Sequence, residues 1–439
     1  MKLTDHGVFL CGGVPQQTAS LSPAEGRKRT MAYRILQAHN QSSDEQNLRI
    51  RFDAMLSHDI TYVGIIQQAR ASGMKEFPIP YALTNCHNSL CAVGGTINED
   101  DHVFGLSAAK KYGGIYVPAN QSVIHSYARE QMAACGAMIL GSDSHTRYGA
   151  LGTMAVGEGG PELAKQLLKH TWDAALPEVV LVYVTGKPRR GVGPHDAAVA
   201  LIKATFANGF VKNRVLEFAG PGIANLPIDF RNGIDVMTTE TTCLSSIWET
   251  DEETKRFFEI HGCPKAYQKL SPGEGAYYDR MIELDLGQIE PMIALPFHPS
   301  NAYTIREFLA NAKELLAGVE AEAKKRWPKA NVHLLDKIHD GGVWADQGII
   351  AGCAGGMFDN IDEAAQILRG GSVGDSYFSM SVYPTSVPVS LALTRMGVTN
   401  IDVSQDCTMC QPERFWSHRV TKGYRGSQTG IIELKEAAQ

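Results

Sequence analysis

The sequence predicts an α/β fold in which short apolar strands alternate with amphipathic helices. One buried strand is expected over 137–140, because an apolar run there ends at Gly141 and polar residues follow it. A second strand is expected over 179–184, where β-branched residues precede a Thr-Gly-Lys-Pro segment. Open α/β sheets bind ligands beyond the carboxyl ends of their strands, so the polar residues after Gly141 are the first candidate site.

The other predicted elements continue this alternation. A helix is expected over 194–207 and a strand over 291–295. The segment Asn360-Ile-Asp-Glu363 resembles a capping box and predicts that a helix opens there. After Asn301, apolar residues recur at three- and four-residue spacing, which predicts one long amphipathic helix with these residues in the core: Ile305, Phe308, Leu309, Ala312, Leu315, Leu316 and Val319.

Composition narrows the class of protein. The chain has 439 residues, 44% of them hydrophobic and 20% charged, which is typical of a soluble globular protein of two or three domains. A net charge of -6 and the lack of clustered Lys and Arg argue against nucleic-acid binding. No run of about 18 apolar residues could span a bilayer, and the first residues do not resemble a signal peptide. We therefore expect a cytoplasmic protein with no membrane or nucleic-acid partner.

Three reactive side chains, Asp143, Ser144 and His145, stand directly after the strand predicted over 137–140. Taken alone, these residue types also fit a solvated turn with a capping Ser or Asp. Read whole, the string Gly-Ser-Asp-Ser-His-Thr, followed one residue later by Tyr-Gly-Ala-Leu-Gly-Thr, closely resembles the signature loop of the aconitase superfamily of iron-sulfur hydro-lyases.

Four distant segments agree with that family in their order along the chain. They are a histidine segment ending at His125, a Met-x-x-Glu segment ending at Glu240, an Asp-Leu strand within 282–299, and a Gly-rich loop around Cys353. The resemblance covers about residues 40–397. It is stronger to a branch of aconitase-like hydratases than to aconitase proper.

The resemblance implies a three-subdomain α/β/α core over 1–397, with subdomains of roughly 1–185, 186–300 and 301–397. It also implies that the chain, with an atypical tail over 398–439, lacks the family's C-terminal swivel domain. That domain carries the serine base and the arginines that bind substrate carboxylates. In related isomerases it is a separate small subunit, so a partner chain of that kind is expected.

The matched segments imply roles for individual residues. His125, Asp143 and His145 would supply the acid/base and orienting groups. Ser144 would hydrogen-bond the substrate, and Glu240 would lie near substrate and iron. The expected chemistry is loss of a hydroxyl bound to an open iron while a base removes the neighbouring carbon-bound proton. The alternative for each side chain is a buried polar group whose hydrogen bonds are purely structural.

Two departures from the family pattern predict a different substrate. Cys86 stands where the aspartate partner of the catalytic histidine belongs, so His87 would lack its usual orienting carboxylate. His58 falls where aconitases use a glutamine to contact substrate. The Cys86-His87 pair could instead bind zinc together with Cys91, although the spacing matches no strong zinc signature.

The nine cysteines are dispersed, and their odd number fits a reducing compartment better than a disulfide framework. The resemblance implies that Cys353 is one ligand of a [4Fe-4S] cluster. Cys407 and Cys410 could supply two more and leave one iron open. However, the family's Cys-Gly-Pro-Cys loop is not found, and residues 400–435 resemble the end of the laccase-domain, purine nucleoside phosphorylase-like family. The pair is therefore a set of cluster ligands in an altered loop, a structural pair in a grafted tail, or a product of gene fusion or assembly.

Together these observations favour an aconitase-type hydro-lyase, a hydratase, dehydratase or isomerase acting on a small di- or tricarboxylic acid through a [4Fe-4S] cluster. The alternative is a cluster-free, catalytically inactive relative that binds a ligand or acts as a scaffold. Nucleoside phosphorolysis is a third hypothesis that rests on the tail alone. It is disfavoured because the zinc-binding His and Cys positions of that family find no match.

Overall fold

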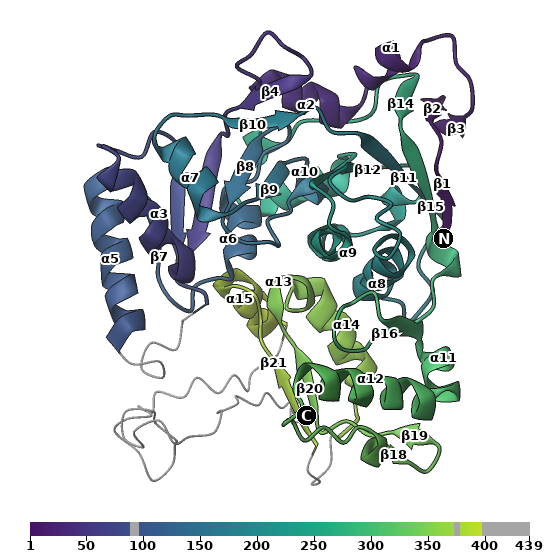
Figure 1. The fold of residues 1–439 in the computed structure, drawn as a ribbon. Coiled ribbons are helices and arrows are strands. Elements are labelled where there is room, and N and C mark those ends of the chain that lie inside the picture. The colour runs from purple at the N-terminus through teal and green to yellow at the C-terminus, as the bar shows by residue number, and fades with distance from the viewer. Residues whose placement is uncertain (88–95, 373–377, 397–439) are drawn as a thin grey trace.

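The computed structural model describes residues 1–87, 96–372 and 378–396 of the chain (Figure 1). It confirms the predicted α/β class, because helices alternate with strands and the two largest sheets are five-stranded and mainly parallel. Strand β9 (Met154–Gly157) of the first sheet contacts β13 (Ser245–Trp248) of the second. Figure 1 shows the C-terminal elements, in green to yellow, below both sheets.

The first sheet is entirely parallel, in the order β7-β6-β5-β8-β9. Alternate residues of its strands pack with α3 on one face and with α6 on the other. Because both faces are covered, the strands are continuously apolar, and the predicted strand over 137–140 is observed as β8. The elements are β5 (Ala54–His58), α3 (Asp59–Ala71), β6 (Tyr81–Thr84), α5 (Thr96–Tyr112), β7 (Ile115–Val117), α6 (Ile124–Gln131), β8 (Met138–Gly141) and α7 (Gly160–Leu167).

The second sheet has the order β1-β15-β11-β12-β13, and only its edge strand β1 is antiparallel. Its two faces pack with α2 and with α8 and α9. The strand predicted over 179–184 and the helix predicted over 194–207 are confirmed as β11 and α8. The elements are β1 (Lys2–Thr4), α2 (Met31–His39), β11 (Val179–Thr185), α8 (Pro194–Thr205), β12 (Val215–Ala219), α9 (Ile228–Met237), α10 (Glu252–Ile260) and β15 (Arg280–Asp285).

Shorter elements surround these two sheets. The strand predicted over 291–295 is confirmed as β16, which forms a hairpin with β17. The remaining elements are β2 (Val8–Cys11), β3 (Val14–Gln16), α1 (Pro23–Arg27), β4 (Asn47–Ile50), β10 (Trp172–Ala175), β14 (Ala276–Tyr278), β16 (Met292–Ala294), β17 (Ala302–Thr304), β18 (Ile338–His339) and β19 (Gly342–Val343).

The prediction of one long helix after Asn301 is wrong. Two helices are observed, α11 (Ile305–Ala310) and α12 (Ala312–Arg326), and Asn311 separates them. The Asn311 side chain donates to the carbonyl of Glu307 over 2.9 Å, a local bond that competes with the helical backbone. Ile305 and Leu309 in α11, expected in the core, are exposed.

The described residues from 347 to 396 form the C-terminal part. It contains a two-stranded parallel sheet and three helices. They are β20 (Gln347–Ile350), α13 (Gly352–Gly355), α14 (Phe358–Leu368), β21 (Ser379–Val382) and α15 (Val387–Arg395). The predicted capping box is also wrong. Helix α14 begins two residues before Asn360, whose side chain donates to the carbonyl of Gly355 over 2.7 Å.

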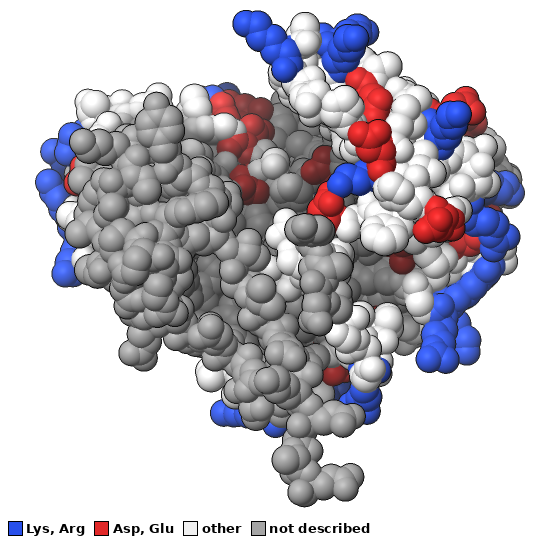
Figure 2. All heavy atoms as spheres, turned by 90° about the horizontal axis from the view of Figure 1, so that it is seen from below, with Lys and Arg blue, Asp and Glu red and all other residues white. Residues whose placement is uncertain are grey.

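The prediction of no nucleic-acid and no membrane partner was based on the net charge and on the lack of a long apolar run. On the face shown in Figure 2, Lys and Arg of the described residues lie beside Asp and Glu. Among the described helices, none combines the length and the apolar character that crossing a bilayer requires. The exclusion of nucleic acid, the cytoplasmic location and the subdomain boundaries stay predictions.

Candidate active site

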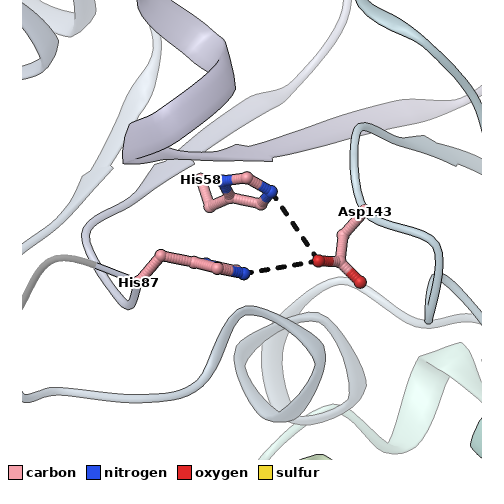
Figure 3. A group of neighbouring side chains, drawn as sticks. All are labelled: His58, His87 and Asp143. Atoms are coloured by element: carbon pink, nitrogen blue, oxygen red, sulfur yellow. Dashed lines mark ion pairs between the residues drawn. The ribbon is translucent and has the colours of Figure 1, made fainter. Parts of the chain in front are cut away.

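Three neighbouring strand ends bring the predicted site residues together. His58 ends β5, His87 follows β6, and Asp143 follows β8, and these strands are adjacent and parallel in the first sheet. Parallel strands place their carboxyl ends at one edge, which is where α/β proteins bind ligands. Figure 3 shows both imidazole rings directed at the Asp143 carboxylate.

The loop after β8 is tightly folded around Asp143. The backbone amide and hydroxyl of Thr146 both donate to the Asp143 carbonyl, over 3.2 and 2.6 Å. A Cβ atom at Gly141 would lie 2.2 Å from the Thr146 hydroxyl, and one at Gly157 would lie 2.5 Å from the Asp143 carbonyl. Glycine at both positions therefore permits the turn that carries the carboxylate.

Asp143 is the centre of the site, because four histidines lie around its carboxylate. Oδ1 accepts hydrogen bonds from His125 Nε2 and from the backbone amide of His145, both over 2.8 Å. Oδ2 lies 3.4 Å from His87 Nε2 and 3.7 Å from His58 Nε2. The His58 and His87 rings lie against each other with centroids 3.7 Å apart.

These neighbours give three of the histidines, His58, His87 and His125, shifted pKa values of two kinds. Burial opposes ionisation of Asp143, but the hydrogen bond from His125 and the polar contact with His87 outweigh it and hold the pKa of that carboxyl well below its usual range. Polar contacts with Asp143 and Cys86 raise the pKa of His87 to about 10. Burial lowers the pKa of His58 and of His125 to about 4. At neutral pH the site therefore offers one carboxylate, one imidazolium and two neutral imidazoles.

Cys86 takes part in this arrangement. Its sulfur lies 3.2 Å from His87 Nδ1, and the backbone amide of His87 donates to Asp59 Oδ1 over 3.0 Å. The sulfur therefore contacts the second ring nitrogen of His87, at the position where the family was expected to have a carboxylate.

A second pair extends the site toward the second sheet. His145 Nε2 lies 3.0 Å from Glu240 Oε1, and Glu240 belongs to the 3-10 turn Thr238–Thr241 after α9. The hydrogen bond to His145 lowers the pKa of Glu240. Ser144 is exposed, and its carbonyl accepts a hydrogen bond from the Thr239 hydroxyl.

Cys353 lies at the border between this site and the C-terminal part. It belongs to α13, and its carbonyl accepts a hydrogen bond from Arg129 Nη1 over 2.8 Å. Burial raises the pKa of the Cys353 thiol, while the charge of Arg129 lowers it. Arg129 is 3% exposed, and its Nε and Nη2 have no hydrogen-bond partner among the described residues.

The structure thus gathers His58, His87, His125, Asp143 and the His145–Glu240 pair in one place, with Cys353 beside them. The roles assigned to these residues and to Ser144 stay predictions. Three predicted metal ligands, Cys91, Cys407 and Cys410, lie outside the described residues.

Sequence reasoning missed two residues of the site. Arg129 follows His125 by four positions, so the helical spacing alone places both side chains on one face of α6. Tyr148 is part of the signature string, and its hydroxyl lies 3.1 Å from His125 Nδ1. That contact leaves His125 Nε2 directed at Asp143.

Comparisons with known proteins show which sequences this chain resembles. Residues 33–410 match the aconitase family (aconitate hydratase). The mitochondrial aconitate hydratase of Saccharomyces cerevisiae is 25% identical over 78% of this chain and 44% of its own length. The 3-isopropylmalate dehydratase large subunit of Campylobacter fetus is 24% identical over 88% of this chain and 85% of its own length.

Two further findings concern the extent of the match. The aconitase-ribosomal protein bL21m fusion protein of Schizosaccharomyces pombe is 24% identical over 88% of this chain, and the match covers 43% of that protein. The chain therefore spans less than half the length of two of these relatives. Residues 387–435 match the multi-copper polyphenol oxidoreductase laccase family, which confirms the resemblance expected for the tail. Because the aconitase match covers most of the sequence, the chain belongs to the aconitase family.

Proposed function

We propose that the chain is a hydro-lyase of the aconitase type acting on a small di- or tricarboxylic acid. The observation that carries this proposal is the ionised Asp143 with His87, His125 and His145 around it, beside the Cys353 thiol. Relatives named aconitate hydratase and 3-isopropylmalate dehydratase support the reaction class. The large-subunit relatives also support a separate swivel-type small subunit as the partner.

The residues around Cys353 fit a [4Fe-4S] cluster. A cluster held by thiolates carries negative charge, and a buried cation without a counter-ion is strongly unfavourable. Arg129 has no ion-pair partner among the described residues, and its Nε and Nη2 are unpaired there, while its Nη1 donates to the Cys353 carbonyl. Cys353 would be one ligand, and Cys407 and Cys410, outside the described residues, would be the others. The cluster would supply an open iron as a Lewis acid for the substrate hydroxyl and carboxylate.

The chain's own side chains would handle the protons. His87, protonated at neutral pH, would donate to the departing hydroxyl. Asp143 would hold His87 and His125 in position, and His125 would keep the Asp143 carboxylate oriented through its 2.8 Å bond. The ionised Glu240 would orient His145 toward the substrate. His58 and Ser144 would contact the substrate, and the base that removes the carbon-bound proton would come from the swivel-type partner.

Anaerobic reconstitution with iron and sulfide tests this proposal. We expect the wild-type chain to take up equal amounts of iron and sulfide and Cys353→Ser to lose most of both. Cys11→Ser is the matched control, because Cys11 lies in β2, away from the site. The proposal is wrong if wild type and Cys353→Ser both hold no cluster, and the chain is then a cluster-free binding or scaffold protein.

A further inference from the structure

The two oxygens of the Asp143 carboxylate have different surroundings. Oδ1 is engaged by His125 Nε2 and by the His145 amide, each over 2.8 Å. Oδ2 faces the Nε2 atoms of His87 and His58 (Figure 3). The carboxylate is therefore held in place through one oxygen while the other is directed at two imidazoles.

The contacts of Oδ2 are longer than good hydrogen bonds. They measure 3.4 Å to His87 and 3.7 Å to His58, against 2.8 Å between His125 and Oδ1. Ligand atoms that share one ion at bonds of about 2.0–2.2 Å lie about 3.0–3.6 Å apart. The three ligand atoms of His58, His87 and Asp143 all lie within 4.8 Å of one another. The His87 distance falls within that range and the His58 distance lies just outside it, so the spacing is closer to that of ligands around one ion than to that of direct hydrogen bonds.

His58 supplies a second, independent indication. His58 is 6% exposed, and its Nδ1 has no hydrogen-bond partner among the described residues. Its Nε2 lies beyond hydrogen-bond distance of Asp143 Oδ2. Figure 3 shows that Nε2, and not Nδ1, is the nitrogen directed at Asp143, so Nε2 is the atom that would bind an ion.

We propose that His58, His87 and Asp143 bind one divalent transition metal ion of the zinc or ferrous-iron type. Two imidazoles and one carboxylate form a ligand set that suits these ions and leaves positions open for water or substrate. The bond from His125 to Oδ1 then acts as the outer-shell contact that orients a ligating carboxylate. The inference goes beyond the proposed function, because these ligands are independent of Cys353. A ligating His87 has no proton on Nε2, so the ion and the proton that His87 would donate are alternative occupants of the site.

An overlapping group is less suitable. Asp59, Cys86 and His87 also have ligand atoms within 4.8 Å of one another. However, Asp59 Oδ1 already accepts the His87 amide over 3.0 Å, and Oδ2 lies 3.5 Å from His102 Nε2. Within the described part of the chain, Asp143 Oδ2 by contrast faces only the two proposed imidazole ligands. The first group is therefore the better site.

Zinc titration calorimetry on the chelator-treated Cys353→Ser chain tests the site. We expect one Zn²⁺ per chain, and an affinity lowered at least about tenfold by His58→Gln, Asp143→Asn or His87→Gln, since even loss of an outer-shell partner has an effect of that size. His87 is accessible at the site, so His87→Gln keeps the test valid if the buried variants fail to fold. His170→Gln, on the surface, is the matched control.

Three outcomes overturn the proposal. They are no bound zinc, zinc binding that all three variants leave unchanged, and zinc binding that only Cys86→Ser and His87→Gln abolish. The last would place the ion at the Asp59 group. None of these outcomes bears on the cluster, whose test is the iron and sulfide content of the chain with Cys353 intact. Repeating the titration with anaerobic Fe²⁺ distinguishes the two ions.

Discussion

The first sheet and the C-terminal part contribute to the same site in different ways. Strands β5, β6 and β8 are buried at every residue. His58 is the last residue of β5, and the segments that carry His87 and Asp143 follow β6 and β8. Strands β20 and β21 are mostly half-exposed, and Cys353 lies on a four-residue helix. The predicted acid/base groups are therefore held by a closely packed scaffold, whereas the Cys353 segment is held by a few contacts such as the one from Arg129.

The largest expected effect tests this difference in packing. Leu140→Ala in β8 removes a side chain that is 0% exposed and should lower the free energy of unfolding by about 2–5 kcal/mol. Ile349→Ala in β20 is the matched control, because Ile349 is 57% exposed and its loss should change stability by no more than about 0.5 kcal/mol. Denaturant unfolding measures both, and similar losses for the two variants would contradict the comparison.

Arg129→Met should loosen the C-terminal part without affecting the first sheet. It removes a charged hydrogen bond to the Cys353 carbonyl, of the kind worth about 1.5–3 kcal/mol. Amide hydrogen exchange in α13 should therefore accelerate by about ten- to a hundredfold, while exchange in β8 stays unchanged. Arg147→Met is the control, since Arg147 donates to the Cys243 carbonyl instead. Equal acceleration in β8 would show that Arg129 stabilises both regions.

The contribution of His87 to the free energy of unfolding should change with pH. Its pKa is raised to about 10 by Asp143 and Cys86, against about 6.5 in an unfolded chain. The folded state thus favours the protonated form, so this stabilisation is complete below about pH 6.5 and is lost as the pH rises through 10. The effect is moderated because the side chain is 32% exposed.

Unfolding of wild type and His87→Gln at pH 6 and pH 10 measures this contribution. The difference in stability between the two proteins should be larger at pH 6 than at pH 10. A difference that is the same at both pH values would mean that the pKa of His87 is not raised in the folded chain.

The contrast between the two regions also explains what the sequence could predict. Continuous apolar strands such as 137–140 and 179–184 are covered on both faces, so their pattern identifies them without knowledge of the contacts. Among the site residues at strand ends, Asp143 was predicted from such a strand, whereas His58 and His87 were predicted from the resemblance to the aconitase family. Hydrophobic spacing failed where packing is incomplete, since Asn311 breaks the helix predicted after Asn301.

Contacts between distant segments could not be predicted from local patterns. The bond between Arg129 and the Cys353 carbonyl joins residues 224 positions apart. The two oxygens of Asp143 differ because four separate segments meet there: the end of β5, the loops after β6 and β8, and helix α6. Such long-range contacts depend on the order of the strands in the sheet, which local sequence patterns do not reveal.

The smallest expected effect concerns the surface of α14. Ile367 is 75% exposed, so Ile367→Ser should change the free energy of unfolding by less than about 0.5 kcal/mol. Ile361 on the same helix is 6% exposed, and Ile361→Ala should cost about 2–5 kcal/mol because it leaves a cavity. A loss at Ile367 comparable to that at Ile361 would mean that another part of the chain, or a second molecule, covers this face. The C-terminal part would then be as closely packed as the first sheet, and Cys353 would be held as rigidly as Asp143.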